Sequence, residues 1–162
     1  LEKGISPCEN ITMAFSEDQY FSTVTGTIPA KSKKDAAGVS FTVQNPYSAP
    51  IVRPYNFEAK DIDPGELETA VNSMAGRMFS EIVTCEVELS SWYDADGLIW
   101  YPNTTIEVKS GEDYIPDFYE FVIRDVVLSK AAGVESAALT LVLPGVYSGE
   151  IPESLPWQEP AL

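Results

Sequence analysis

The stretch that decides the fold is DPGELETAVNSMAGRMFS, residues 63–80, followed directly by EIVTCEVELSSW, residues 81–92. It opens with a helix start signal, because Asp63 is a good N-cap, Pro64 suits the first helical position and Glu66 lies three residues after the cap. Apolar side chains then recur at steps of three and four: Leu67, Ala70, Val71, Met74, Ala75, Met78 and Phe79. We expect one amphipathic helix over about residues 64–79, with both methionines in the core.

The period changes after this helix. Residues 82–92 alternate apolar and polar side chains, which predicts an antiparallel strand with one buried and one solvated face. Other candidate strands are rich in Thr, Val and aromatic residues and lie at 10–15, 20–28, 39–43, 51–60, 106–108, 118–128 and 139–143. The predicted fold class is therefore mainly β (α+β), with antiparallel β-barrel-like sheets and one helix. We expect three parts: a β-strand region at 1–60, a helix plus antiparallel β domain at 61–148, and a Pro-rich C-terminal arm at 149–162.

The charge of the chain excludes some classes of function. Its 162 residues include 25 acidic and 10 basic side chains, a formal charge of −15. Specific nucleic-acid binding is disfavoured, because it depends on Lys and Arg displacing counterions from phosphates. No apolar run approaches the roughly 18 to 20 residues that cross a bilayer, and the first thirty residues lack a signal-peptide pattern. We expect no membrane insertion and no export.

The reactive residue types are also restricted. The chain contains no histidine, which removes Ser-His-Asp and Cys-His machinery and most zinc sites. Cys85 falls on the apolar side of the predicted strand, so we expect it to be a buried free thiol, whereas the redox state of Cys8 stays open. No phosphate loop or dinucleotide fingerprint is present. We expect no enzyme, no catalytic residue, no metal and no cofactor.

The most distinctive segment is Ser91–Asn103, where Asp94-Ala95-Asp96-Gly97 predicts a turn between apolar strands. A calcium loop is disfavoured because the twelfth residue from Asp94 is Thr105 rather than glutamate. A glycosidase acid pair is disfavoured because an exposed turn does not raise the pKa of a carboxyl. A sugar-stacking platform stays open, since four aromatic residues flank the turn: Trp92, Tyr93, Trp100 and Tyr101. The favoured interpretation is a structural hairpin with aromatic packing.

Two segments fit no regular element. The Lys31–Lys34 segment holds three lysines and predicts either a surface loop or, less readily, a loop that docks a partner. The C-terminal arm carries Pro152, Pro156 and Pro160 around Trp157, which predicts an extended arm or linker. A large aromatic side chain on such an arm is expected to find a groove on its own body or on a neighbour.

Several of these segments, taken in order, resemble the Mu-type phage baseplate hub proteins of contractile tails. The shared features are Arg53-Pro54, the helix with Ala75-Gly76-Arg77, the strand ending in Trp92, the run Asp96-Gly97-Leu98-Ile99-Trp100-Tyr101-Pro102-Asn103-Thr104, the strand with Ile106 and Val108, and the run Leu139-Thr140-Leu141-Val142-Leu143-Pro144-Gly145. The match covers roughly residues 50–147, and Phe21–Gly26 resembles the preceding family strand more weakly. Residues 78–81 depart from the family, whose members often carry more basic residues there, and the Pro-rich tail has no counterpart in it.

The resemblance implies a trimeric hub in the virion baseplate that assembles in the host cytoplasm and joins the tail tube to the central spike. The chain then corresponds to the C-terminal half of a longer protein, and its partners are further copies of itself, tube and spike proteins. DNA passes without specific binding. No catalytic residue is carried over. The candidate hairpin or interface residues are Trp92, Asp94, Asp96, Gly97, Trp100, Pro102 and Asn103.

The acidic residues Glu86, Glu88 and Glu107 are candidates for a channel lining, where negative charge would keep passing DNA from sticking. The simpler alternative is that they solubilise an outer face. A different class of function also stays open, a carbohydrate-binding β module of a virion or cell-surface protein that uses Trp92 and Trp100.

Overall fold

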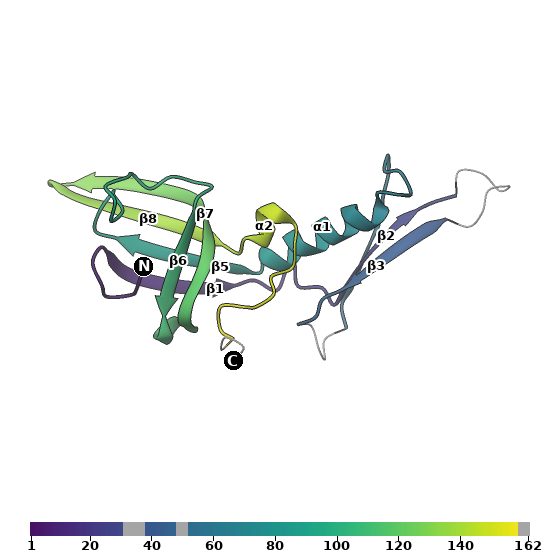
Figure 1. Cartoon of the computed structure of the whole chain (residues 1–162), viewed down its shortest axis with the longest axis horizontal. Helices are drawn as coiled ribbons and strands as arrows, with labels where there is room; N and C mark the ends of the chain where they lie inside the picture. Colours follow the sequence, from purple (N-terminus) through teal and green to yellow (C-terminus); the bar gives the residue numbers. More distant parts are fainter. Residues whose placement is uncertain (31–37, 48–51, 159–162) are drawn as a thin grey trace. The chain divides into compact units, whose positions relative to one another are not determined.

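The computed structural model describes residues 1–30, 38–47 and 52–158 of the chain. Within these ranges the order of elements is β1 (Cys8–Phe15), β2 (Thr23–Ile28), β3 (Val39–Gln44), β4 (Pro54–Glu58), α1 (Leu67–Ser80), β5 (Val83–Leu89), β6 (Thr105–Ser110), the 3-10 helix η1 (Gly111–Asp113), β7 (Ile115–Ala131), β8 (Val134–Val142) and α2 (Gly145–Ser148) (Figure 1). The predicted fold class is confirmed: the chain is mostly β, with an antiparallel half-barrel sheet and one main helix. None of the described helices is long and apolar enough to span a bilayer.

The chain divides into two compact units that interleave along the sequence. Unit 1 contains residues 1–15, 83–144 and the segment from Pro152 onward, and unit 2 contains residues 16–82 and 145–151. The parts expected from the sequence, 1–60, 61–148 and 149–162, are consecutive ranges, and they stay a prediction.

Unit 1 is built on a five-stranded antiparallel sheet in the order β1-β5-β8-β7-β6. β5 lies between β1 and β8, with Cys85 opposite Met13 on one side and opposite Leu141 on the other. The apolar side chains of β5 are buried while Glu86 and Glu88 are exposed, so the predicted half-buried strand is confirmed. The sheet curls because alternate side chains from all five strands face a common core.

The N-terminal segment closes much of the gap between the two sheet edges. Glu2 forms a parallel bridge with Lys109 of β6, flanked by bonds from the Lys109 amide to the Leu1 carbonyl and from the Lys3 amide to the Lys109 carbonyl. The chain then turns through residues 4–7 into β1, which is the opposite edge of the sheet. The result is a half-barrel whose edges are linked by one short segment.

Both cysteines are buried in unit 1 and neither forms a disulfide. Cys8 lies opposite Leu89, whereas Cys85 lies four residues away along β5, a separation of roughly 13 Å at about 3.3 Å per residue. Disulfides need Cα atoms within about 7 Å, so these two thiols cannot pair in this fold. Burial raises the pKa of the Cys85 thiol to about 12, and burial also raises the pKa of Cys8. The predicted buried free thiol at Cys85 is therefore confirmed.

Unit 2 contains a three-stranded mixed sheet in the order β3-β2-β4. β2 pairs antiparallel with β3 but parallel with β4, a pairing that was not expected from the sequence. β3 ends at the end of the sheet where β2 begins, opposite Thr23. β4 begins at that same end on the other side of β2, so it runs in the direction of β2.

Helix α1 covers one face of this sheet. Its buried residues Leu67, Val71, Ala75 and Met78 form one core with Val24 of β2 and with Ala59, which follows β4. Met74 packs against this core. The expected core role of both methionines is confirmed. The close approach requires glycine in β2, since a Cβ at Gly26 would lie 2.5 Å from Cγ2 of Val71.

The start of α1 differs from the prediction by three residues. The N-cap is Glu66, without a side-chain cap, and the prediction that Asp63 caps the helix is wrong. Instead the Glu66 amide donates to the Asp63 carbonyl over 2.9 Å, and the first helical bond runs from the Ala70 amide to the Glu66 carbonyl. Residues 63–66 therefore form a turn that precedes the helix, and the low helix propensity of Gly65 favours this later start.

The C-terminal arm packs on unit 1 over residues 152–158. Leu155 and Pro156 are buried, and the Trp157 ring meets the Phe15 ring edge-on with centroids 5.4 Å apart. The Tyr119 hydroxyl also donates to the Ser154 carbonyl over 2.9 Å. The arm thus finds its groove on its own body. The Lys31–Lys34 segment lies outside the described residues.

Candidate functional site

The predicted turn at Asp94–Gly97 is present, but it sits in a long connection rather than in a hairpin of two paired strands. Residues 90–104 link β5 to β6, which are not neighbours in the sheet, and the two sides of the turn share one bridge, Tyr93 to Ile99. Oδ1 of Asp94 accepts hydrogen bonds from the amides of Asp96 and Leu98, at 2.9 and 2.8 Å. This oxygen of the Asp94 carboxylate therefore stabilises the turn.

Glycine is required at position 97 of this turn. Gly97 has φ of +78°, and its amide donates to the Asp94 carbonyl over 3.2 Å. Among the described residues no group of three or more carboxylate or thiol side chains is arranged to hold a metal ion.

The two tryptophans of the connection are anchored to backbone carbonyls. Nε1 of Trp92 donates to the carbonyls of Ser129 on β7 and Ser136 on β8, at 2.9 and 3.0 Å. Nε1 of Trp100 donates locally to the Ser91 carbonyl over 3.2 Å. Trp92 therefore ties the connection to the β7–β8 hairpin, whereas Trp100 fixes the connection to itself. Sequence reasoning singled out both residues but gave no means of finding these partners.

Pro102 and Asn103 lead the connection back to the sheet. Asn103 has φ of +64°, a left-handed conformation that Asn tolerates better than most residues, and its amide donates to the Ile123 carbonyl over 2.8 Å. The Thr104 carbonyl then accepts a hydrogen bond from the Ile123 amide, so the chain pairs with β7 just before β6 begins. The seven candidate residues between Trp92 and Asn103 thus form one continuous, backbone-anchored connection.

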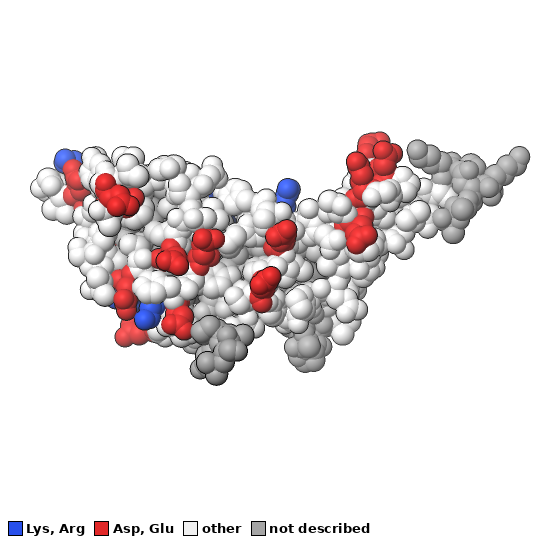
Figure 2. Space-filling model, in the orientation of Figure 1, with Lys and Arg blue, Asp and Glu red and all other residues white. Residues whose placement is uncertain are grey.

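The three acidic candidates do not come together. Glu86 and Glu88 project from the solvated face of β5, which β8 and β7 separate from β6 in the sheet order. Glu107 of β6 lies directly opposite Glu120 of β7, and both side chains are exposed. Like charges directly opposite each other on neighbouring strands are destabilising, so this pair is an electrostatic cost to the fold. On the face drawn in Figure 2, acidic side chains occur in separate groups over both units and basic side chains are few.

An open cavity of about 520 Å³ lies beside the turn in unit 1. Its lining combines the Trp100 ring with four acidic residues: Asp94, Asp96, Glu107 and Glu120. An aromatic face beside carboxylate oxygens can stack on a sugar ring and accept hydrogen bonds from its hydroxyls. The sequence indicated Trp100 and the turn acids, but only the fold adds the acids of β6 and β7.

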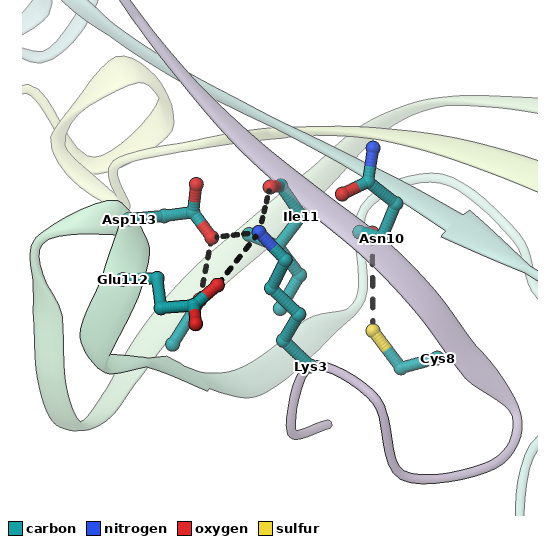
Figure 3. A network of polar contacts seen from close by, with 7 residues as sticks. Lys3, Cys8, Asn10, Ile11, Glu112 and Asp113 are labelled. Atoms are coloured by element: carbon teal, nitrogen blue, oxygen red, sulfur yellow. Dashed lines mark hydrogen bonds and ion pairs between the residues drawn. The ribbon is translucent and has the colours of Figure 1, made fainter.

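A polar network that the sequence did not indicate stabilises the link between the sheet edges. Nζ of Lys3 lies 2.7 Å from Oδ2 of Asp113 and 3.8 Å from the Glu112 carboxylate, and it donates to the Ile11 carbonyl of β1 over 3.4 Å (Figure 3). The buried Ser110 hydroxyl donates to the same Asp113 oxygen over 2.6 Å.

These contacts determine the ionisation of Asp113. Partial burial on its own would raise the pKa of Asp113, but the bonds from Lys3 and Ser110 outweigh it and lower the pKa overall. The bond to Asp113 likewise raises the pKa of Lys3, against a smaller opposing effect of desolvation. The network therefore holds an ion pair across the gap in the half-barrel, and it is structural.

Searches of family models and of curated proteins find no match for this chain. Two tail proteins are among the solved structures that share its fold. The 43 kDa tail protein of prophage MuSo2 from Shewanella oneidensis matches over 90% of this chain with a TM-score of 0.74 and 18% identity. The tail protein from Neisseria meningitidis MC58 matches over 93% of this chain with a TM-score of 0.73 and 16% identity.

The matched region is 43% and 44% of those two chains, so this chain spans less than half the length of either tail protein. At these identities the likeness establishes a shared fold that includes both units, and the chain's solved structural neighbours are phage tail proteins.

Proposed function

We propose that this chain is a structural component of a phage tail. The observation that carries the proposal is the fold likeness to two tail proteins over at least nine-tenths of the chain. Chance likeness to one small barrel would not extend through the mixed sheet, helix α1 and the barrel together. Because the chain spans less than half of those proteins, the role of the whole protein is part of the proposal.

Within the tail, we propose the baseplate hub: a homotrimeric ring that joins the tail tube to the central spike in the virion. The ordered series of features from Arg53 to Gly145 that resembles Mu-type hub proteins supports this finer assignment. Light scattering over a range of concentrations tests it. A mass of three times 17.7 kDa is expected, and a strict monomer at every concentration contradicts trimer formation by this chain.

The partners follow from the same proposal. Tail tube and spike proteins of the same phage are expected to co-purify with it from a host that expresses all three. A tail without spike attachment is expected when the chain is omitted, and complete tails formed in its absence would contradict the hub assignment.

We further propose that Glu86, Glu88 and Glu107 approach the channel of the ring and keep passing DNA from adhering. Replacing Glu86 and Glu88 by lysine is expected to create salt-dependent retention of duplex DNA, because the substitutions bring cations to the phosphates. The matched control reverses two exposed acids of unit 2, Glu17 and Glu68. Equal DNA retention by both double variants would mean that the β5 acids have no special position.

A carbohydrate-binding module is the second candidate, favoured by the cavity beside Trp100. Binding on a glycan array that is lost in Trp100→Ala and kept in Leu98→Ala, an exposed residue of the same connection, is the expected result for this alternative. Absence of binding by the unmodified chain at millimolar sugar concentrations would contradict it.

A further inference from the structure

Strand β7 extends well beyond its neighbour β6. It runs over 17 residues, but β6 pairs with it only from Ile115 to Val122. Beyond that point β7 pairs with β8 alone, and β8 in turn pairs with β5 only from Ala137 onward. Residues 129–136 therefore form a two-stranded ribbon that continues past the rest of the sheet, and residues 125–128 of β7 pair with β8 alone. We call residues 125–136 the β7–β8 ribbon.

The β7–β8 ribbon has an open main-chain edge along β7. Alternate N–H and C=O groups of an edge strand point away from its partner, and here no other strand of the described chain pairs with residues 125–131 on that side. An isolated pair of strands is marginal in water, so a ribbon with an open edge is a template for another strand.

The side chains of the ribbon are unusual for this protein. Val127, Leu128 and Val134 are 59%, 36% and 69% exposed. The charged residues of the ribbon and its base are Arg124, Asp125, Lys130 and Glu135, which form two ion pairs of 2.9 Å each, so residues 124–136 have no net charge in a chain of −15. The ribbon is thus neutral and apolar on a strongly acidic molecule.

The ribbon is also held in place before any partner arrives. Trp92 bonds to a carbonyl on each of its strands, and the Lys130 ammonium lies 5.5 Å from the centre of the Trp92 ring. A surface that is ordered in advance loses less conformational entropy on binding.

We propose that the β7–β8 ribbon is the docking surface for a second copy of this chain, which adds a strand to the open edge of β7. A second copy of a chain with charge −15 is repelled over most of this surface, and it approaches at lowest electrostatic cost at the β7–β8 ribbon, where the charge is least. In a three-fold ring each contact is head-to-tail, so the strand that docks on β7 comes from a different edge of the second copy. Main-chain pairing supplies the attraction, and burial of the exposed valines adds to it. The inference rests on the proposed homotrimer and assigns one of its contacts.

Hydrogen exchange of the full 162-residue chain, measured by mass spectrometry at low and high protein concentration beside light scattering, tests the docking. Amides of residues 125–131 are expected to exchange about tenfold more slowly in the assembled form than in the monomer. Val134→Glu is expected to weaken self-association about tenfold or more, because it places a like charge in the contact. Val52→Glu makes the same change at a position that is 89% exposed in unit 2, and it is expected to associate as the unmodified chain does.

The outcomes separate the two proposals. A trimer whose ribbon amides exchange as fast as in the monomer, and that Val134→Glu and Val127→Glu leave intact, overturns the docking surface and leaves the trimer standing. A chain that stays monomeric at every concentration overturns both. Circular dichroism and unfolding midpoints of the Val134→Glu, Val127→Glu and Val52→Glu variants establish that the comparison is between folded chains.

Discussion

Gly76 on α1 and Gly149, just after α2, are in direct backbone contact: a Cβ added at Gly76 would lie 2.1 Å from the Gly149 carbonyl oxygen. Both residues belong to unit 2. The obstacle is main chain and cannot rotate away, unlike the end of a flexible side chain. A similar approach occurs one turn later, where a Cβ at Gly145 would lie 2.1 Å from Oγ of the buried Ser80. The segment 145–151 is therefore fitted to one narrow groove on α1.

Gly76→Ala is expected to destabilise the fold by about 1–3 kcal/mol, the usual cost of overpacking. Helix propensity alone predicts the opposite sign, a gain of about 1 kcal/mol, so the direction of the change is decisive. Urea unfolding measures it. Gly65→Ala is the control, because a Cβ there meets nothing within 4 Å. A Gly76→Ala variant as stable as Gly65→Ala would contradict the packing of α2 on α1.

Trp92→Phe is expected to loosen the β7–β8 ribbon, since it keeps an aromatic ring but removes the donor shared by the Ser129 and Ser136 carbonyls. The loss should be about 1–2 kcal/mol, with faster amide exchange confined to residues 125–136. Trp100→Phe removes one local bond to Ser91 and is expected to leave those amides unchanged. Equal exchange in the two variants would mean that Trp92 does not hold the ribbon.

The elements set by local periodicity were predictable. The alternation of β5 and the apolar stripe of α1 follow from side-chain spacing. The main differences are at element ends: the helix begins at Leu67 rather than at residue 64, and the strand ends at Leu89 rather than at residue 92. The parallel pairing of β2 with β4 was not predictable, because spacing within a strand does not specify its neighbour. The same limit applies to the candidate site. The residues of the turn were visible in the sequence, but Trp92 meets carbonyls 37 and 44 residues away.

The two thiols are expected to be unreactive in the folded chain. Burial raises the pKa of Cys85 to about 12 and raises that of Cys8, so little thiolate is present at pH 8 and neither sulfur is accessible. Ellman's reagent should detect no thiol in the native chain and two after unfolding in guanidinium chloride. Rapid modification of one native thiol would contradict the burial of that cysteine, and Cys8→Ser and Cys85→Ser identify which one reacts.

Asp113 is expected to make part of the stability depend on pH, through a network that links residues 110 positions apart in the sequence. Its pKa is lower in the folded chain than the ordinary value of about 3.9. A lowered carboxyl pKa stabilises the fold above the unfolded pKa, and the contribution is lost as the pH falls through the folded pKa. Asp113→Asn should therefore be less stable than the unmodified chain at pH 7. The difference should shrink as the pH falls below about 4, where the carboxyl group is protonated first in the unfolded chain and then, at still lower pH, in the folded chain. Urea unfolding midpoints between pH 2.5 and pH 7, chosen to bracket that value, measure this difference in stability.

Glu112→Gln is the control: the Glu112 carboxylate is 3.8 Å from Lys3 and largely exposed, so the substitution should have a small effect on stability at every pH. If the Asp113→Asn deficit stayed constant down to the lowest pH, its origin would be packing or hydrogen bonding, and the charge of Asp113 would not be what holds the sheet edges together.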